Sequence, residues 1–224
     1  MSEATWSAVD DYFARQLVPE DDALVAALEA SAAAGLPPHQ VSACQGKLLM
    51  MLALMNRART ILEIGTLGGY STIWLARALP EHGSLVTLEM DTKHAEVARA
   101  NIDRAGVGPL VDLRVGRALE SLPKLAKERP RPFDMIFIDA DKASNPDYFR
   151  WALQLSRRGS VIVVDNVVRD GAVVDADSED PSVKGVRKLM ALMASEPRVN
   201  ATAIQTVGSK GYDGFAIAMV IANS

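Results

Sequence analysis

The sequence predicts an α/β protein built on a doubly wound sheet of seven strands, with a helical extension before it. Two observations support this prediction. From Thr60 onward, short and nearly continuous apolar segments alternate with amphipathic helical segments, which is typical of a parallel sheet covered by helices on both faces. The last two apolar segments follow one another without a helix between them. We therefore expect a mostly parallel sheet with one antiparallel edge strand.

The chain before Thr60 contains three helical segments. Residues 4–18 carry aromatic and aliphatic side chains at helical spacing. A second helix, residues 21–33, begins with acidic side chains, which suit the positive end of a helix dipole. The stretch "GLPPH" interrupts the pattern before a third helix over residues 42–56.

The strands and helices of the core follow from the same periodicity. The expected strands are residues 60–65, 84–89, 110–116, 133–140, 160–166, 199–207 and 211–222. The expected helices between them are residues 71–79, 93–105, 119–128, 146–157 and 183–195. This order of elements is Rossmann-like.

No repeat or Pro/Ser-rich linker divides the chain. We therefore expect a single domain over residues 1–224, with N-terminal helices in residues 1–58 and a Rossmann-like core in residues 59–224.

The composition argues against several classes of function. A net charge of −4 disfavours non-specific binding of nucleic acid or of an anionic membrane. The single cysteine, Cys44, excludes an internal disulfide and a zinc site with several cysteines. The first residues lack the apolar region of a signal peptide, and the longest apolar run, Leu48–Met55, is too short to span a bilayer. We expect a cytoplasmic protein.

Acidic and amide side chains close the apolar strand segments. Glu63 and Glu89 end the first two strands, Asp139 ends the fourth, and Asp165 with Asn166 ends the fifth. Ligands of doubly wound proteins bind outside the carboxyl ends of the strands. Each acid alone could be a helix cap, but together they favour a binding site at this edge.

A glycine-rich turn, "LEIGTLGGYS", follows the first strand. Its glycines let the backbone approach a ligand closely, although the G-x-x-G-G spacing differs from the dinucleotide fingerprint. Glu89 is the acid expected to bind a ribose diol, so a nicotinamide cofactor and S-adenosylmethionine both remain open. Glu63 favours the second, because a carboxylate beside the turn would repel a pyrophosphate and tolerate a sulfonium cation.

Asp139, Asp165 and Asn166 form a set of oxygen donors at two strand ends. Such hard donors suit Mg²⁺, Mn²⁺ or Ca²⁺ rather than zinc, although a hydrogen-bonded Asp–Asn turn would give the same pattern. Lys142 follows Asp139 by three residues. A lysine beside a cation loses its proton more readily and could act as a general base; the alternative is a surface ion pair with Asp141 or Asp147.

At this point the residues match a known family. The sequence resembles the metal-dependent, class I S-adenosylmethionine-dependent O-methyltransferases, the group that contains catechol and caffeoyl-CoA O-methyltransferases. The resemblance extends from Val41 to the C-terminus and rests on "EIGTLGGYS", "TLEMD", "AGV", "FIDADK", "DNVVRDG" and "GYDG" in this order. The segment "DADK" is closer to the bacterial, caffeoyl-CoA-type branch than to the mammalian catechol enzyme.

The resemblance implies a role for each matching position. The implied contacts to S-adenosylmethionine are Val41, Glu63, Gly65, Thr66, Ser71, Glu89, Ala118, Asp139 and Asp141. The implied metal ligands are Asp139, Asp165 and Asn166. The implied catalytic residues are Lys142, as general base, and Asp139.

The resemblance also implies an activity. The expected reaction moves the methyl group of S-adenosylmethionine to a hydroxyl of a small vicinal-dihydroxy aromatic acceptor, leaves S-adenosylhomocysteine, and depends on Mg²⁺ or a similar ion. The alternatives are a nicotinamide-dependent oxidoreductase on the same sheet and a protein that binds S-adenosylmethionine without catalysis. A homodimer is expected from the family and from the apolar N-terminal segment.

Two departures from the family pattern limit what can be carried over. Many relatives have an acid where this chain has Arg117, which leaves only Ala118 as an adenine contact. The segment "TVGSKGYDG" lacks the substrate-facing Glu of the mammalian catechol enzyme, so the acceptor stays open. Loops over residues 167–182 are expected to wall its pocket, and Arg169 there is consistent with an acceptor that carries an anionic group.

Overall fold

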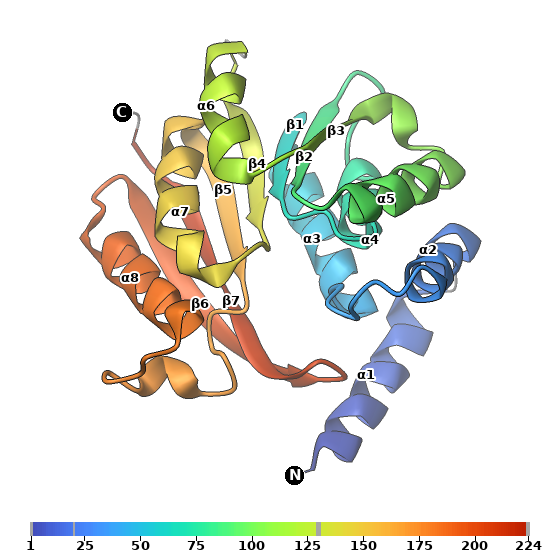
Figure 1. The fold of residues 1–224 in the computed structure, drawn as a ribbon, viewed down its shortest axis with the longest axis horizontal. Coiled ribbons are helices and arrows are strands. Elements are labelled where there is room, and N and C mark those ends of the chain that lie inside the picture. Colours follow the sequence, from blue (N-terminus) through green and yellow to red (C-terminus); the bar gives the residue numbers. More distant parts are fainter. Residues whose placement is uncertain (1, 20, 129–130, 223–224) are drawn as a thin grey trace.

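A computed structural model of the protein describes residues 2–19, 21–128 and 131–222 (Figure 1). Residues 1 and 223–224, at the ends of the expected 1–224 domain, lie outside the described residues. The strands are β1 (Thr60–Ile64), β2 (Ser84–Glu89), β3 (Val111–Val115), β4 (Phe133–Ile138), β5 (Ser156–Asp165), β6 (Val199–Gly208) and β7 (Gly211–Val220). The α-helices are α1 (Glu3–Leu17), α2 (Asp22–Ala33), α3 (Ala43–Met55), α4 (Tyr70–Ala76), α5 (Thr92–Arg104), α6 (Ala118–Glu128), α7 (Asn145–Gln154) and α8 (Pro181–Ser195).

The seven strands form one sheet in the order β3-β2-β1-β4-β5-β7-β6, which confirms the predicted fold class. β1 to β5 are parallel, and β7 pairs antiparallel with both β5 and β6. The antiparallel pair lies at one edge, as expected, but the strand that reverses direction is β7, one position in from the edge. The strand order reverses between β1 and β4, which is where a doubly wound sheet binds its ligand.

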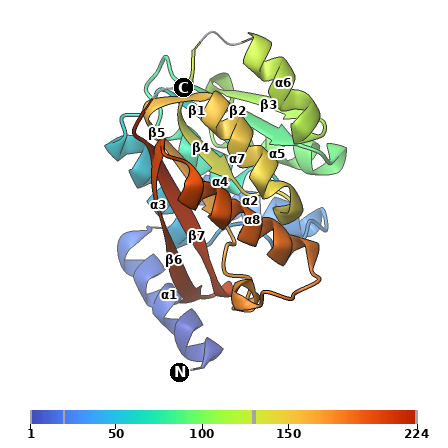
Figure 2. The ribbon, with the colours of Figure 1, turned by 90° about the vertical axis from the view of Figure 1, so that its left-hand side faces the viewer.

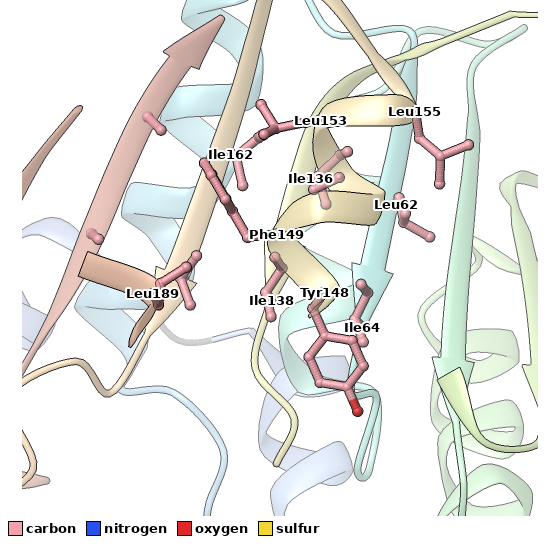
Figure 3. Close-up of a cluster of buried hydrophobic side chains, with 14 of the residues drawn as sticks. Leu62, Ile64, Ile136, Ile138, Tyr148, Phe149, Leu153, Leu155, Ile162 and Leu189 are labelled. Carbon is pink, nitrogen blue, oxygen red and sulfur yellow. The ribbon is translucent and has the colours of Figure 1, made fainter. Parts of the chain in front are cut away.

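Helices cover both faces of the sheet because side chains alternate along each strand. Leu62 and Ile64 face α6, α7 and α8, whereas Ile61 faces α3, α4 and α5. Figure 3 shows Phe149 of α7 in the first of these layers, packed against the sheet. Phe149 is fully buried, and burial of a side chain of this size stabilises the fold by about 1.5–3 kcal/mol.

One predicted boundary is wrong. The expected helix 146–157 ends at Gln154, and β5 begins at Ser156. Ser156 and Arg157, which were expected to form the last turn of this helix, belong to the strand, because Ser156 pairs with Phe133. The register of β4 and β5 then shifts through a bulge. Arg157 in this bulge forms an ion pair of 2.5 Å with Asp134.

The N-terminal helices differ in how firmly they pack. Asp21 caps α2 and also forms an ion pair of 2.7 Å with Arg77, at the end of α4. In contrast, α1 has no buried residue, and Figure 2 shows it beside the end of the β6–β7 hairpin. There the carboxylate of Asp10 accepts a hydrogen bond of 2.8 Å from the Ser209 backbone. Among the described helices, none has the length and apolar character needed to cross a bilayer.

Candidate active site

The register of the sheet brings the predicted site residues together. Ile64 at the end of β1 pairs with Leu88 of β2 and Ile138 of β4, and Ile138 pairs with Val164 of β5. The carboxyl ends of four strands are therefore level with one another. The side chains that follow them, which are far apart in the sequence, meet at one edge of the sheet.

Gly65 makes this meeting possible. Its φ of 99° is in the region that favours glycine. A Cβ atom at this position would lie 2.1 Å from the backbone oxygen of Asp139. The glycine thus lets the first turn pass directly beside the end of β4, so that the cofactor turn and Asp139 share one site.

A cavity of about 900 Å³ opens at this edge. All but one of the predicted site residues line it. These lining residues are Val41, Gly65, Thr66, Ser71, Glu89, Ala118, Asp139, Asp141, Lys142, Asp165 and Asn166. The exception is Glu63, which is fully buried. The cavity is long enough to run across several strand ends, from Ala118 after β3 to Asn166 after β5.

Glu89 is braced on both carboxylate oxygens. Its Oε2 accepts hydrogen bonds from the backbone of Thr66 (3.1 Å) and Leu67 (2.8 Å), and its Oε1 accepts one of 2.9 Å from Asp91. These bonds join the glycine-rich turn to the end of β2 and hold the carboxylate at the cavity wall. Ala118 is the first residue of α6, so its N–H has no partner within the helix and can serve a ligand.

Glu63 lies beneath the cavity and supports it. Its carboxylate accepts hydrogen bonds from the hydroxyls of Ser71 (2.7 Å), Thr72 (2.5 Å) and Thr87 (2.7 Å). Burial, only partly offset by these bonds, raises the pKa of Glu63 to about 7. The argument against a pyrophosphate assumed that Glu63 is always negatively charged. With a pKa of about 7, the carboxyl group is partly protonated near neutral pH, so that argument is weaker than the sequence indicated. Glu63 acts on the cavity through Ser71, which lines it.

The other part of the cavity holds the two expected metal carboxylates and the lysine. The Nζ of Lys142 donates a hydrogen bond of 2.6 Å to Oδ1 of Asp139, so the surface ion pair considered as an alternative is not the arrangement found. Asp165 is buried, and burial followed by the charge of Asp139 raises its pKa. Asn166 has a φ of 56°, a conformation that Asn tolerates better than most residues.

These residues fit a hard divalent cation by their chemistry. In the described part of the chain, no three His, Cys, Asp or Glu side chains gather closely enough to hold a metal. The expected set is smaller, with the carboxylates of Asp139 and Asp165 and the amide of Asn166. The carboxylate of Asp139 is close enough to disfavour ionisation of Asp165, and a set that offers only oxygen donors suits Mg²⁺, Mn²⁺ or Ca²⁺.

Tyr148 and Lys210 also line the cavity, although no sequence pattern marked either of them as a site residue. Tyr148 of α7 donates a hydrogen bond of 2.5 Å to Oδ2 of Asp141. Asp141 lies before the turn that precedes α7, and Tyr148 lies in the first turn of that helix, so no regular spacing in the sequence joins the two residues. Lys210, in the β6–β7 turn, donates a hydrogen bond of 2.8 Å to the Pro38 carbonyl. The predicted antiparallel pairing of the last two strands was the only signal for it.

Comparison with known proteins identifies the relatives of this chain. A family model described as O-methyltransferase matches residues 16–218. A catechol O-methyltransferase of Niastella koreensis is 53% identical over 220 residues, which are 98% of this chain and 100% of that protein. A catechol O-methyltransferase of Mycobacterium tuberculosis is 55% identical over 212 residues, 95% of this chain and 94% of that protein.

Solved structures agree in fold. An O-methyltransferase from Bacillus cereus in complex with SAH has a TM-score of 0.97 and 57% identity, covering 98% of this chain and 100% of that one. The O-methyltransferase TomG from Streptomyces achromogenes, involved in tomaymycin synthesis and in complex with SAM, has a TM-score of 0.95 and 54% identity, covering 99% and 100%.

Proposed function

This chain belongs to the O-methyltransferase family, and we propose that it methylates one hydroxyl of a vicinal-dihydroxy aromatic compound with the help of a divalent metal. S-adenosylmethionine is the methyl donor of the enzyme, as the comparisons indicate. The observation that carries the proposal is a single cavity that contains a cofactor wall at Glu89 and a carboxylate–lysine pair at Asp139 and Lys142. The oxidoreductase and non-catalytic alternatives have no comparable support.

The cofactor would occupy the part of the cavity over β1, β2 and β3. Glu89 would accept hydrogen bonds from the ribose hydroxyls, and the free N–H of Ala118 would bond the adenine. Gly65, Thr66 and Ser71 would surround the methionine portion, with Val41 opposite and Asp141 as a further contact. All of these residues line the same cavity, and Glu63 would contribute by holding Ser71 in place.

Asp139, Asp165 and Asn166 would hold the cation. A cation at these residues would withdraw electrons from both hydroxyls of a bound acceptor and make them more acidic. Lys142 would then accept the proton at Nζ, which requires it to be neutral, with its lone pair directed at the hydroxyl. The oxygen left with the negative charge attacks the methyl carbon as the carbon–sulfur bond breaks. Positioning of the two reactants in one cavity would supply much of the acceleration.

The acceptor class rests on the relatives. Two proteins at 53% and 55% identity bear the name catechol O-methyltransferase. Three protein donors would leave three coordination positions on Mg²⁺, which two oxygens of a catechol and one water would fill. The test is transfer of labelled methyl from S-adenosylmethionine to a panel of vicinal dihydroxyphenols, with Mg²⁺ or with EDTA. We expect transfer that EDTA abolishes and Mg²⁺ restores.

Three variants sharpen this test. Asp139→Ala and Asp165→Ala should abolish metal-dependent transfer while the circular dichroism spectrum stays that of a folded protein. Asp147→Ala, which removes an exposed carboxylate paired with Arg150 on α7, is the matched control and should retain activity. Wild-type rates in both site variants would show that these residues do not hold a required metal.

We also propose that a second copy of the chain covers α1. A free helix of 15 residues is marginal in water, yet α1 exposes Val9, Tyr12, Phe13 and Leu17 and has no buried residue of its own. Equilibrium sedimentation should report a homodimer, and Phe13→Asp should shift it to monomer. A monomeric wild-type protein at micromolar concentration would overturn this part.

The remaining expectations stay predictions. We propose that residues 1–224 act as one methyltransferase domain, which the docking of α2 on α4 through Asp21 and Arg77 supports. The cytoplasmic location is a prediction that fractionation of the source cells would test.

A further inference from the structure

The strand order arranges the cavity along one line. Its cofactor end lies over β3, β2 and β1, and the carboxylates of the expected metal site follow β4 and β5. The next strand in the sheet is β7, and because β7 runs antiparallel to β5, its first residues lie at the same edge as Asp165. Side chains near the start of β7 are therefore on the far side of the metal residues from the cofactor, where the body of an acceptor would extend.

Arg169 lines the cavity at this far end. Its side chain is about one-third exposed, and its Nη1 lies 3.8 Å from Oδ2 of Asp213, which is a loose ion pair and too long for a hydrogen bond. Oδ1 of Asp213 is occupied by the backbone N–H groups of Val168 (2.9 Å), Arg169 (3.1 Å) and Gly214 (3.0 Å). Asp213 thus shapes the loop, and the buried Nε of Arg169 has no hydrogen-bond partner in the described structure.

Lys210 lines the same end from the β6–β7 turn. Its ammonium donates one hydrogen bond, to the Pro38 carbonyl at 2.8 Å, and forms no ion pair with a described carboxylate. Two of its three N–H groups remain available to a ligand. The hydrogen bond also joins this turn to the Pro38–Val41 loop, so that the lysine is held at the cavity rim although its side chain is long.

We propose that Arg169 and Lys210 form an anion-binding subsite for a carboxylate on the aromatic acceptor, so that the preferred substrates are dihydroxyphenyl carboxylic acids. The inference rests on the proposed function. Both cations are engaged below their capacity, and a planar carboxylate can accept two hydrogen bonds from a guanidinium and another from an ammonium. No carboxylate of the described chain forms an ion pair with Lys210. The carboxylate of Asp213 pairs with Arg169 only loosely, at 3.8 Å, because the backbone holds it through Oδ1.

The test compares 3,4-dihydroxybenzoate with its neutral amide, 3,4-dihydroxybenzamide. Wild-type enzyme should show a lower KM for the acid, and added salt should reduce this advantage. In Arg169→Gln, kcat/KM for the acid should fall about tenfold further than kcat/KM for the amide, and in Lys210→Met about threefold further, mainly through KM. Each variant is compared with wild type on the same compound, so the ratio of the loss on the acid to the loss on the amide does not depend on the different reactivity of the two aromatic rings.

Arg150→Gln is the matched control, because Arg150 pairs with Asp147 on the exposed surface of α7 and does not line the cavity. It should change neither substrate's kcat/KM. Equal losses on acid and amide in Arg169→Gln and Lys210→Met, with wild-type enzyme active on both, would overturn the subsite and leave the proposed function intact. Absence of transfer to either compound and to unsubstituted catechol would overturn the proposed function, and the subsite with it.

Discussion

The Nζ of Lys142 lies 2.6 Å from Oδ1 of Asp139, which places the proposed general base in direct contact with a proposed metal ligand. The two side chains are 11% and 19% exposed, so this ion pair is screened less than one at the surface. An oxygen that accepts the ammonium's hydrogen bond cannot at the same time give its full charge to a cation. A metal held at Asp139 would therefore compete with Lys142 for this carboxylate.

Removal of the lysine should strengthen metal binding. In Lys142→Met, we expect Mn²⁺ to bind about tenfold more tightly, since the competing charged hydrogen bond and the repulsion between two cations are both lost. Methyl transfer should be abolished in the same variant. Calorimetric titration with Mn²⁺ measures the first effect, and Lys184→Met, which removes an exposed lysine paired with Glu179, is the control. Unchanged or weaker Mn²⁺ binding would contradict the competition.

Glu63 should make the stability of the protein depend on pH. Its pKa is about 7 when folded and 4.5 in the unfolded chain, so the folded state binds the proton more tightly. Below pH 4.5 Glu63 is protonated in both the folded and the unfolded state, so its contribution to stability is fully present. As the pH rises from 4.5 to about 7, the unfolded state ionises first and the free energy of unfolding falls. Above about pH 7 Glu63 is ionised in both states, and the free energy of unfolding falls no further on its account. The loss is about 3 kcal/mol at most.

Glu63→Gln tests this dependence. The amide cannot ionise, so we expect urea unfolding of the variant to lose less free energy than wild type between about pH 5 and pH 8. Glu81→Gln, at an exposed position, should leave the pH dependence of wild type unchanged. If Glu63→Gln and wild type lose the same free energy over this interval, the carboxylate is not held with a raised pKa.

Tyr148 should act on the cofactor through Asp141. Tyr148→Phe removes the hydroxyl that donates to Oδ2 of Asp141, so the carboxylate is less restrained. We expect KM and Kd for S-adenosylmethionine to rise about threefold to tenfold, with kcat changed much less, because the reacting atoms are not touched. Tyr12→Phe, on exposed α1, is the control. A fall in kcat at constant Kd would assign Tyr148 a different role.

Gly185 should be required for the position of Lys142. A Cβ atom on Gly185 of α8 would lie 2.1 Å from the Lys142 carbonyl oxygen and 2.7 Å from the Cα of Ala143. Gly185→Ala must therefore displace the turn that carries the lysine. We expect about 1–3 kcal/mol lower stability in urea and a larger relative loss in kcat than in cofactor binding. Ala191→Ser, at an exposed position of α8, should be near neutral; a stable and fully active Gly185→Ala would show that the turn can move without consequence.

Local patterns in the sequence predicted most of the fold, because each strand and helix of the core has its own periodicity. The error at residues 146–157 arose where Ser156 and Arg157 continued a helical pattern. The pairing of Ser156 with Phe133 instead places these residues in a strand. That pairing joins segments far apart in the chain, and no local pattern contains it.

The candidate site could be predicted in part for the same reason. Asp139, Asp165 and Asn166 end recognisable strands, and parallel strands place their carboxyl ends at one edge whatever their order. Glu63 also ends a strand, yet its side chain points to the face under the glycine turn, where Ser71, Thr72 and Thr87 bond it. An acid at the end of an apolar strand segment can contact a ligand directly or hold up the residues that do, and the sequence pattern is the same in both cases.

The sequence by itself determined the fold class, the strand ends and the oxygen donors at them, because these depend on side-chain chemistry at regular spacing. Only the tertiary structure decided which strands are neighbours. The order β5-β7-β6 brings Lys210 to the same cavity end as Arg169, and the antiparallel course of β7 puts its first residues beside Asp165. Such contacts depend on the packing of the whole sheet, since residues that meet across strands carry no shared local signal.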